Sequence, residues 1–364
     1  MILNSVLSSW ARSLAKVPTL GLDFSDLSVK FLRFNERGGA LSVGSIGNVP
    51  LKEGVIVNGS IEKQGALVDV LKDLKSLAGR AVRSKFVIAS LPEEKGFIQL
   101  LRIPAVKAEN LEGAVRWELE SAVPLPADEI YFDFEVLSSG AGSDHVEVLV
   151  LAYPRVLVDS YVDVLHKAGM IPMVLELESQ AIVRSLILPS NKEPMLIVDI
   201  GATRTSFVLV SGGNIIHTST ISISGKLFEE KIQQELGIPS EKARELKFEA
   251  GLDGTKAEGK VAHALGGPLL SLLEEIQRHL DFFRDHIVGH GGSVSSIERI
   301  ILTGGDSNLL GLDSYIARSS KVHVEKWNPF ALVLPRMRNK LPPVPANVAH
   351  QYTTAIGLAL RGLT

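Results

Sequence analysis

The sequence predicts an α/β protein built from two similar lobes. Two segments that lie 176 positions apart align without a gap, residues 20–34 on residues 196–210. Each segment is an apolar strand that carries an aspartate near its end, Asp23 or Asp199, followed by a short polar turn and a second strand. The length of 364 residues fits such a duplication, because it exceeds what one hydrophobic core normally holds. We therefore expect two related lobes that face each other across a cleft.

The first repeat is followed by a run of alternating strand and helix patterns. Apolar residues recur at helical spacing over residues 63–78, while shorter apolar runs bounded by glycine and proline indicate strands. A β-β-α-β-β-α order between residues 84 and 170 predicts a subdomain inserted into the first lobe. Its predicted elements are strands 85–90 and 97–103, helix 107–122, strands 131–137 and 145–153, and helix 155–168.

The second half of the chain carries several helix boundary signals. Ser224 and Gly237 stand where an N-cap and a C-cap would bracket a helix over residues 226–236. Pro268 opens the most regular apolar pattern of the chain, which continues at helical spacing until Gly289 ends it. The remaining predicted elements are strand 171–177, helix 179–188, strand 297–302 and the closing helix 352–363.

We expect these elements to assemble into five parts. Residues 1–17 form an amphipathic helix with Trp10 on its apolar face, and two roles for it stay open, a docking helix and a short anchor at a lipid surface. The other parts are the first lobe at 18–83, 171–190 and 345–364, the inserted subdomain at 84–170, the core of the second lobe at 191–225 and 298–344, and its helical subdomain at 226–297.

The amino-acid composition excludes several classes of protein function. The formal net charge is −3, which gives no basic footprint for a nucleic acid. Cysteine is absent, so disulfides and thiolate metal sites are excluded. No stretch approaches the ~18 apolar residues that a membrane-spanning helix needs. We therefore expect a folded globular protein that does not bind nucleic acid.

The second repeat has the pattern of a site for phosphate and magnesium. Asp199 comes at the end of a buried strand, and a carboxylate at that end faces the crevice where α/β sheets bind ligands. Such a carboxylate can hold Mg²⁺ through water. Gly201 lets the backbone approach phosphate oxygens, and the amides and hydroxyls of the turn at Ala202 and Thr203 can donate to them.

The first repeat departs from this pattern. Ser25 replaces the glycine, which hinders a close approach of the backbone, and Asp26 adds a negative charge where a phosphate would have to sit. Ser28 and Lys30 can compensate in part, through a hydrogen bond and a positive charge. A single turn with an aspartate after a strand is usually a plain turn without a ligand. The repetition of this turn at equivalent positions of the two segments is what favours a phosphate and magnesium site.

A third glycine-containing segment follows strand 297–302. The sequence TGGDSNL at residues 303–309 places adjacent glycines where a base or ribose can lie against the backbone. A plain strand-to-helix turn with Ser307 as N-cap is the alternative, and taken alone the segment favours it. The segment GTKAEGK at residues 254–260 begins like a P-loop but lacks the final Ser or Thr and a preceding strand, which indicates a surface loop.

With these residues in view, the chain resembles the actin-like ATPase superfamily, and within it the PilM family of type IV pilus assembly proteins. The division protein FtsA is a more distant relative with the same layout. The resemblance runs over nearly the whole chain from Pro18 onward. Besides the phosphate turns it is carried by AVRWELE at 114–120, VPLPADE at 123–129, SGKLF at 224–228, LTGG at 302–305, NPF at 328–330 and AIGLALRGL at 355–363.

The resemblance implies an actin-like fold that binds ATP and Mg²⁺ between its lobes. By position, Asp23 and Asp199 would flank the magnesium, and Glu178 lies where the superfamily often keeps a polar residue for the attacking water. The residues implied to contact the nucleotide are Ser25, Ser28, Lys30, Gly201, Ala202, Thr203 and Thr205 at the phosphates, Gly304, Gly305 and Ser307 at the adenosine, and Lys231, Glu241, Arg244 and Lys247 near the base or ribose.

The family also implies a cytoplasmic scaffold, peripheral to the inner membrane, that binds the N-terminal cytoplasmic peptide of a PilN-like protein in a groove beside the inserted subdomain. The pilus motor ATPases are further candidate partners. Because Ser25, Asp26 and Leu27 depart from the usual small-residue turn, we expect ATP hydrolysis to be slow or absent while nucleotide binding persists. Two alternatives stay open, an FtsA-like membrane-tethered ATPase that forms filaments and a small-molecule kinase of the same superfamily.

Overall fold

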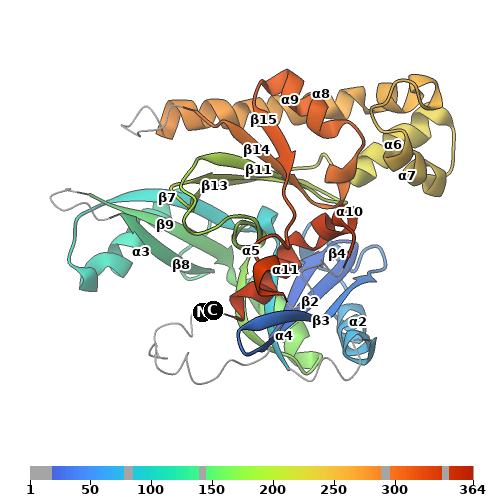
Figure 1. Cartoon of the computed structure of the whole chain (residues 1–364). Coiled ribbons are helices and arrows are strands. Elements are labelled where there is room, and N and C mark those ends of the chain that lie inside the picture. The colour runs from blue at the N-terminus through green and yellow to red at the C-terminus, as the bar shows by residue number, and fades with distance from the viewer. Residues whose placement is uncertain (1–18, 78–84, 139–144, 288–295, 338–343, 364) are drawn as a thin grey trace.

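Two five-stranded sheets with the same strand order form the frame of the molecule (Figure 1). The computed structural model describes residues 19–77, 85–138, 145–287, 296–337 and 344–363. The first sheet has the order β3-β2-β1-β6-β10 and the second has the order β13-β12-β11-β14-β15. The strands are β1 (Leu20–Ser25), β2 (Ser28–Arg37), β3 (Ala40–Pro50), β6 (Phe86–Leu91) and β10 (Ile171–Leu177), then β11 (Met195–Ile200), β12 (Thr205–Ser211), β13 (Asn214–Ile221), β14 (Arg299–Thr303) and β15 (His323–Lys326).

The two repeats fold into hairpins of identical register. Asp23 lies opposite Lys30 in the first hairpin, and Asp199 lies opposite Ser206 in the second, so both pairs differ by the same 176 positions. In each sheet the aspartate strand also pairs in parallel with the next strand on its other side, β6 or β14. The duplication read from the sequence therefore extends to the pairing of whole sheets.

Segments from three parts of the chain build the first lobe. On one face of its sheet, α2 (Gln64–Leu77) and α4 (Arg155–Lys167) pack against β1 and β6 in an apolar cluster that includes Leu22 and Leu71. On the other face lie α5 (Glu178–Leu186) and the C-terminal α11 (Thr353–Arg361). These two helices cross closely, since a Cβ at Gly357 would lie 1.8 Å from the carbonyl oxygen of Ala181. The end of the chain thus completes the first lobe.

The helices of the second lobe cover one face of its sheet, and one of them begins earlier than predicted. They are α6 (Gly225–Leu236), α7 (Ser240–Glu249), α8 (Lys260–Phe282) and α9 (Leu312–Ser320). Ser224 caps α6 by accepting from the Leu227 amide, and Gly237 ends it at φ +65°, which confirms both predicted caps. The predicted start of α8 at Pro268 was wrong. Val261 and Leu265 are fully buried and extend its apolar face, and this burial outweighs the one backbone hydrogen bond that proline removes.

The inserted segment has its own three-stranded sheet of order β7-β9-β8. Its elements are β7 (Phe97–Pro104), α3 (Leu111–Ala122), β8 (Ile130–Ser138) and β9 (His145–Pro154). The β-β-α-β-β-α order is observed, but its first strand and last helix, β6 and α4, pack with the first lobe. A short apolar segment such as β6 can occupy a buried parallel position in either sheet. Its sequence pattern therefore does not show which sheet the strand joins.

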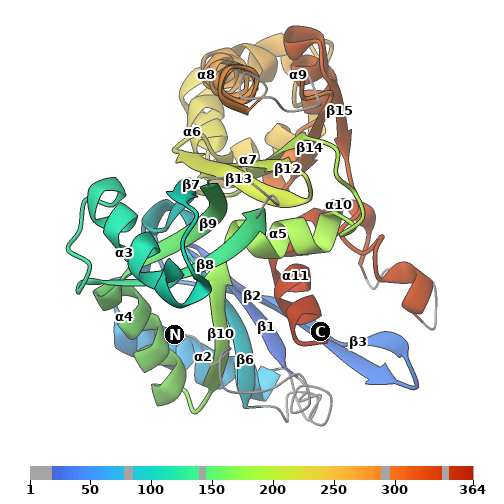
Figure 2. The same ribbon diagram turned by 90° about the vertical axis from the view of Figure 1, so that its left-hand side faces the viewer.

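The inserted sheet contacts both lobes (Figure 2). Strand β7 lies beside β13 of the second lobe, and β9 leads directly into α4 of the first lobe. Leu149 of β9 shares one apolar cluster with Ile182 of α5 and Ile197 of β11. Among the described residues, every helix is too short or too polar to cross a lipid bilayer. The predicted helix at residues 1–17 lies outside the described residues.

Candidate functional site

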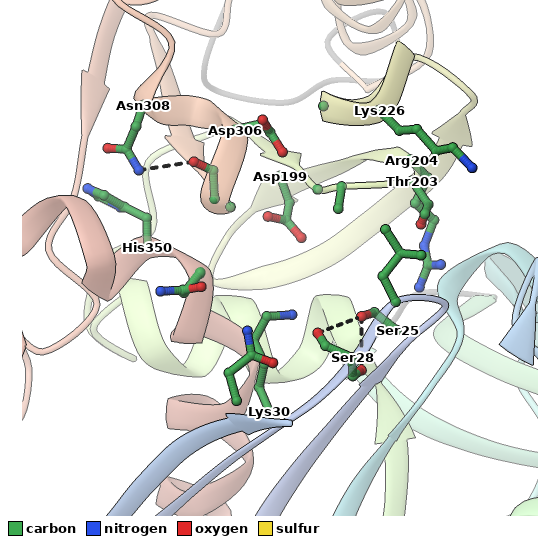
Figure 3. Close-up of a pocket in the computed structure, with 18 of the residues that line it drawn as sticks. Ser25, Ser28, Lys30, Asp199, Thr203, Arg204, Lys226, Asp306, Asn308 and His350 are labelled. Atoms are coloured by element: carbon green, nitrogen blue, oxygen red, sulfur yellow. Dashed lines mark hydrogen bonds between the residues drawn. The ribbon is translucent and has the colours of Figure 1, made fainter. Parts of the chain in front are cut away.

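A cavity of about 880 Å³ lies between the lobes and is lined by both hairpins. In Figure 3, Asp199, Thr203 and Asp306 line one side, while Ser25, Ser28 and Lys30 line the other. The carboxyl ends of β1 and β11 meet here because the two sheets face each other across the same opening. The residues separated by 176 positions in the sequence therefore share one site.

The two repeated aspartates are held differently. Asp23 is buried, its Oδ2 lies 3.6 Å from Lys30 Nζ, and its Oδ1 accepts a hydrogen bond from the Ser90 hydroxyl at 3.4 Å. Within the described part of the chain Asp199 forms no ion pair of this kind, although the charges of Lys30 and Arg204 act to lower its pKa. Burial, and then the negative charge of Asp23, raise the pKa of Asp199 to about 6. A cation placed between these carboxylates would relieve that repulsion.

The turn after β11 is closed by its own backbone and tied to α6. The Gly201 amide donates to the Arg204 carbonyl at 2.9 Å, and the Gly225 amide donates to the Gly201 carbonyl at 3.0 Å. Gly201, Ala202 and Thr203 line the cavity. Thr205 does not line it, because this residue is fully buried and its hydroxyl donates to the Ile223 carbonyl at 2.7 Å.

In the turn after β1, the Asp26 side chain is not placed as the sequence predicted. The carboxylate of Asp26 accepts hydrogen bonds from the amides of Asn58 and Gly59, each at 3.1 Å. Asp26 is not among the residues that line the cavity, so the expectation that its charge occupies the place of a phosphate was wrong. Ser25 and Ser28 do line the cavity, with the Ser25 hydroxyl donating to the Ser28 carbonyl at 3.0 Å.

Gly304 brings the third loop against the turn of β11. It has φ +85°, and a Cβ at this position would lie 2.4 Å from both Asp199 Oδ1 and the Ile200 carbonyl oxygen. Gly304 and Gly305 line the cavity, whereas Ser307 is buried and donates to the Gly304 carbonyl at 2.7 Å. Ser307 lies inside a 3-10 helix, η7 (Gly305–Asn308), and does not cap a helix. Glycine at 304 is needed for this close approach of two loops.

A buried ion cluster lies beside this loop. Lys247, on α7, is 2% exposed and pairs with Asp306 and with Glu229 Oε1, the latter at 2.6 Å. Burial raises the pKa of Asp306 although Lys247 opposes the shift. A Cβ at Gly225 would lie 2.0 Å from the Asp306 carboxylate, so glycine there makes room for it. Sequence reasoning placed Lys247 near the base or ribose but gave Asp306 no role.

Three further predicted residues have different surroundings. Arg244 lines the cavity. Lys231 and Glu241 do not line it, since the Lys231 ammonium donates to Gln234 Oε1 at 3.3 Å on the surface and Glu241 is exposed. Helical spacing could not separate these residues, because α6 and α7 each turn only one face to the cavity.

Glu178 is the first residue of α5 and lies buried at the floor of the cavity. Burial raises its pKa well above the usual range, against the lowering effect of Arg204. Arg204 itself was missed by sequence reasoning. Its Nη2 lies 2.6 Å from Glu178 Oε1 and its Nη1 lies 3.0 Å from Glu94 Oε1. No sequence pattern identifies an ion-pair partner that lies 26 or 110 residues away along the chain.

The donors at the cavity suit a hydrated magnesium ion carried by a phosphate ligand. Among the described residues, no group of three or more His, Cys, Asp or Glu could hold a metal by itself. Mg²⁺ commonly takes one or two carboxylates and fills its other positions with water and phosphate oxygens. Asp23 and Asp199 provide two carboxylates, and the glycine turn and Lys30 provide donors for an anion. The residues therefore fit a magnesium–nucleotide complex.

Comparisons with known proteins agree with this geometry. A family described as type IV pilus assembly protein PilM matches residues 21–363. The structure is similar to that of a PilM–PilN type IV pilus biogenesis complex, with 26% identity, a TM-score of 0.80, and coverage of 96% of this chain and 100% of that chain. MreB 5 of Spiroplasma citri bound to AMPPNP is similar at 13% identity and TM-score 0.56, over 94% of this chain and 95% of that one.

EutJ, an ethanolamine utilization protein from Carboxydothermus hydrogenoformans, is similar at 13% identity and TM-score 0.55, over 95% of this chain and 90% of that chain. At this identity, the likeness to MreB and EutJ concerns the fold alone. The predicted actin-like fold, with two α/β lobes and an insertion, is confirmed.

Proposed function

The chain belongs to the PilM family of type IV pilus assembly proteins, which are actin-like ATPases, and we propose on this premise that it is an ATP-binding scaffold of the pilus assembly platform. In this role it binds ATP with Mg²⁺ between its lobes and holds the N-terminal cytoplasmic peptide of a PilN-like membrane protein. The observation that carries the nucleotide part is the convergence of Asp23 and Asp199 on one cavity.

Each lobe contributes to nucleotide binding in this proposal. Asp23 and Asp199 hold the hydrated Mg²⁺, which neutralises phosphate charge when it is bound. The amides of Ala202 and Thr203 donate to the phosphates, assisted by Ser28 and Lys30 from the first lobe. The Gly201 amide bonds the Arg204 carbonyl, so Gly201 contributes by letting the backbone come close. Gly304 and Gly305 leave room for the nucleoside, with Arg244 on the wall beside them.

The surroundings of Glu178 support slow or absent hydrolysis. A general base must be free to accept a proton from water within hydrogen-bond reach of the substrate. Glu178 is instead engaged by Arg204 at 2.6 Å in a buried ion pair, so its carboxylate is not free to orient a water. ATP binding therefore serves as a conformational signal more than as an energy source in this proposal.

One similar structure supports the proposed partner, and the proposed location depends on that partner. The similar structure is described as a PilM–PilN complex, which supports a PilN-like partner for this chain. We place the peptide beside the inserted sheet of β7, β8 and β9, which projects from the body between the two lobes (Figure 1). A tail from a membrane protein would keep the scaffold at the cytoplasmic face of the inner membrane, where the pilus motor ATPases are further candidate partners.

Titration of a PilN-like peptide tests this function. A synthetic peptide covering the N-terminal cytoplasmic segment of the PilN-like protein from the same source is titrated into the full chain by calorimetry, with and without MgATP. We expect saturable binding of one peptide per chain, with no binding of a peptide of the same composition in scrambled order. Equal affinity for the two peptides would contradict the partner assignment.

A further inference from the structure

The side chain of Arg204 links the two lobes at the floor of the cavity. Arg204 belongs to the turn between β11 and β12, and its guanidinium bonds Glu94 and Glu178 of the first lobe. Its side chain is 14% exposed, and those of Glu94 and Glu178 are 17% and 8% exposed. Because solvent screens such a pair weakly, the contact strongly constrains the relative positions of the two lobes.

Glu94 lies on the segment that leads into the insertion. The 3-10 helix η2 (Glu93–Lys95) connects β6 of the first sheet to β7 of the inserted sheet. Its neighbour Glu93 accepts a hydrogen bond from the Ser179 amide at 3.0 Å, in the first turn of α5. The Tyr153 hydroxyl, at the end of β9, donates to the Pro92 carbonyl at 3.3 Å. Thus η2 is fixed to α5 on one side and to the inserted sheet on the other.

The insertion also rests on the second lobe directly. Strand β13 contacts both β7 and η2 (Figure 2). Leu149 of β9 packs in one cluster with Ile197 and Val208, which lie on the strands that flank the Arg204 turn. A shift of that turn relative to η2 would therefore reach β7 through contiguous packed groups.

A ligand phosphate would compete for the Arg204 guanidinium. Arg204 lines the cavity directly after Ala202 and Thr203, whose amides are proposed to donate to phosphate. Guanidinium groups bind phosphate and carboxylate with the same planar fork, so one group cannot fully satisfy both. An added phosphate competes with Glu94 for Nη1, while the closer contact of Nη2 with Glu178 at 2.6 Å is kept.

We propose that Arg204 couples nucleotide binding to the inserted subdomain. A nucleotide phosphate in the cleft weakens the contact between Arg204 and Glu94, which frees η2 from the Arg204 turn and shifts β7. The inference rests on the proposed function, since it takes the cleft to bind a nucleotide and the insertion to hold the partner. Arg204 acts here as a positioning residue, through Glu94, and not on the partner itself.

Hydrogen exchange of the full chain tests this coupling without the partner. Amide exchange is followed in β7, β8 and β9 with and without MgATP, for the wild type and for Glu94→Gln. We expect MgATP to change exchange in these strands by about fivefold or more in the wild type. The change should largely disappear in Glu94→Gln, while calorimetry shows MgATP still bound.

Glu53→Gln is the matched control, because Lys226 and Glu53 form another interlobe pair, at 2.9 Å on the exposed rim, that includes no residue of η2. It should keep the wild-type exchange response. Should Glu94→Gln fail to fold, Arg204→Lys carries the test, since lysine keeps the charge but cannot bond two carboxylates in a fork.

The possible outcomes separate this inference from the proposed function. An undiminished exchange response in a folded Glu94→Gln variant would overturn the coupling role of Arg204. MgATP binding by the wild type without any exchange response in the insertion would overturn it too, and would leave the nucleotide site standing. Absence of MgATP binding by the wild type would overturn the proposed function, and the coupling with it.

Discussion

Asp199 titrates under the influence of Asp23, which reaches the same cavity from the other lobe. Burial and the charge of Asp23 raise the pKa of Asp199 from 3.8 to about 6. The two residues hold equivalent places in hairpins of equal register, so the duplication itself brings their charges together. Their convergence on one cavity is the feature that supports the proposed magnesium–nucleotide site.

The affinity for MgATP should fall as the pH drops through 6. Protonated Asp199 cannot contribute a negative charge to the metal, so affinity should decrease up to about tenfold for each pH unit below 6. Calorimetric titrations between pH 5 and 8 in ~0.15 M salt measure this dependence. In Asp199→Asn the residual affinity should be weak at every pH. An affinity of the wild type that stays constant down to pH 5 would contradict the role of Asp199.

The same residue should affect stability in the absence of nucleotide. Since its folded pKa lies above its unfolded value, the folded state retains a proton between about pH 4 and 6 that the unfolded state has lost. The contribution of Asp199 to the free energy of unfolding therefore decreases as the pH rises from about 4 to 6. Asp199→Asn should raise the free energy of unfolding at pH 7, by on the order of 2 kcal/mol, and should change it little at pH 4. Urea denaturation at both pH values measures the difference.

Asp26 should matter for stability and not for nucleotide binding. Its carboxylate accepts from the amides of Asn58 and Gly59, so Asp26→Ala leaves two donors without their partner. We expect a loss of about 1–2 kcal/mol in the free energy of unfolding, with MgATP affinity unchanged. Asp26→Asn, which keeps one acceptor oxygen, should lose less. Tighter MgATP binding by Asp26→Ala would instead mean that the charge does reach the phosphates.

Gly304 and Gly305 should respond differently to alanine. At Gly304 the added methyl would collide with Asp199 and with the Ile200 carbonyl, and φ is +85°. Gly304→Ala should therefore lower stability by about 1–3 kcal/mol and reduce MgATP binding sharply. At Gly305 the nearest atom to an added Cβ is Gln351 Cβ at 3.7 Å, so Gly305→Ala should melt like the wild type. Equal melting temperatures for the two variants would contradict the close approach at Gly304.

Lys247 should be essential to the fold of the second lobe. Replacing it with methionine removes the buried ammonium that pairs with both Asp306 and Glu229. We expect Lys247→Met to lose about 3–5 kcal/mol in the free energy of unfolding. The double variant Lys247→Met with Asp306→Asn should recover part of that loss in urea denaturation. A double variant no more stable than the single one would argue against the pair as the cause.

The sequence could reveal the parts of this structure that depend on local pattern. The repeat placed Asp23 and Asp199 at equivalent strand ends, and Ser224 and Gly237 marked both ends of α6, because these signals lie within a few adjacent residues. The start of α8 was missed since proline usually ends a helix, whereas here buried side chains before it decide the outcome.

Other features depend on contacts between distant segments. The orientation of Asp26 is set by amides 32 and 33 residues away, and the role of Arg204 by carboxylates of another lobe. The side on which β6 pairs depends on β1 and β10. No periodicity or spacing records such contacts, so only the three-dimensional structure could show them.

Calorimetry with ATP and ADP tests the central claim most directly, that the cleft between the lobes is a magnesium–nucleotide site. The wild type and Asp199→Ala are titrated with each nucleotide, once with Mg²⁺ and once with excess EDTA. We predict micromolar binding by the wild type that requires Mg²⁺ and is lost in the variant. No binding by the wild type, or equal binding by Asp199→Ala, would contradict the assignment of this cleft.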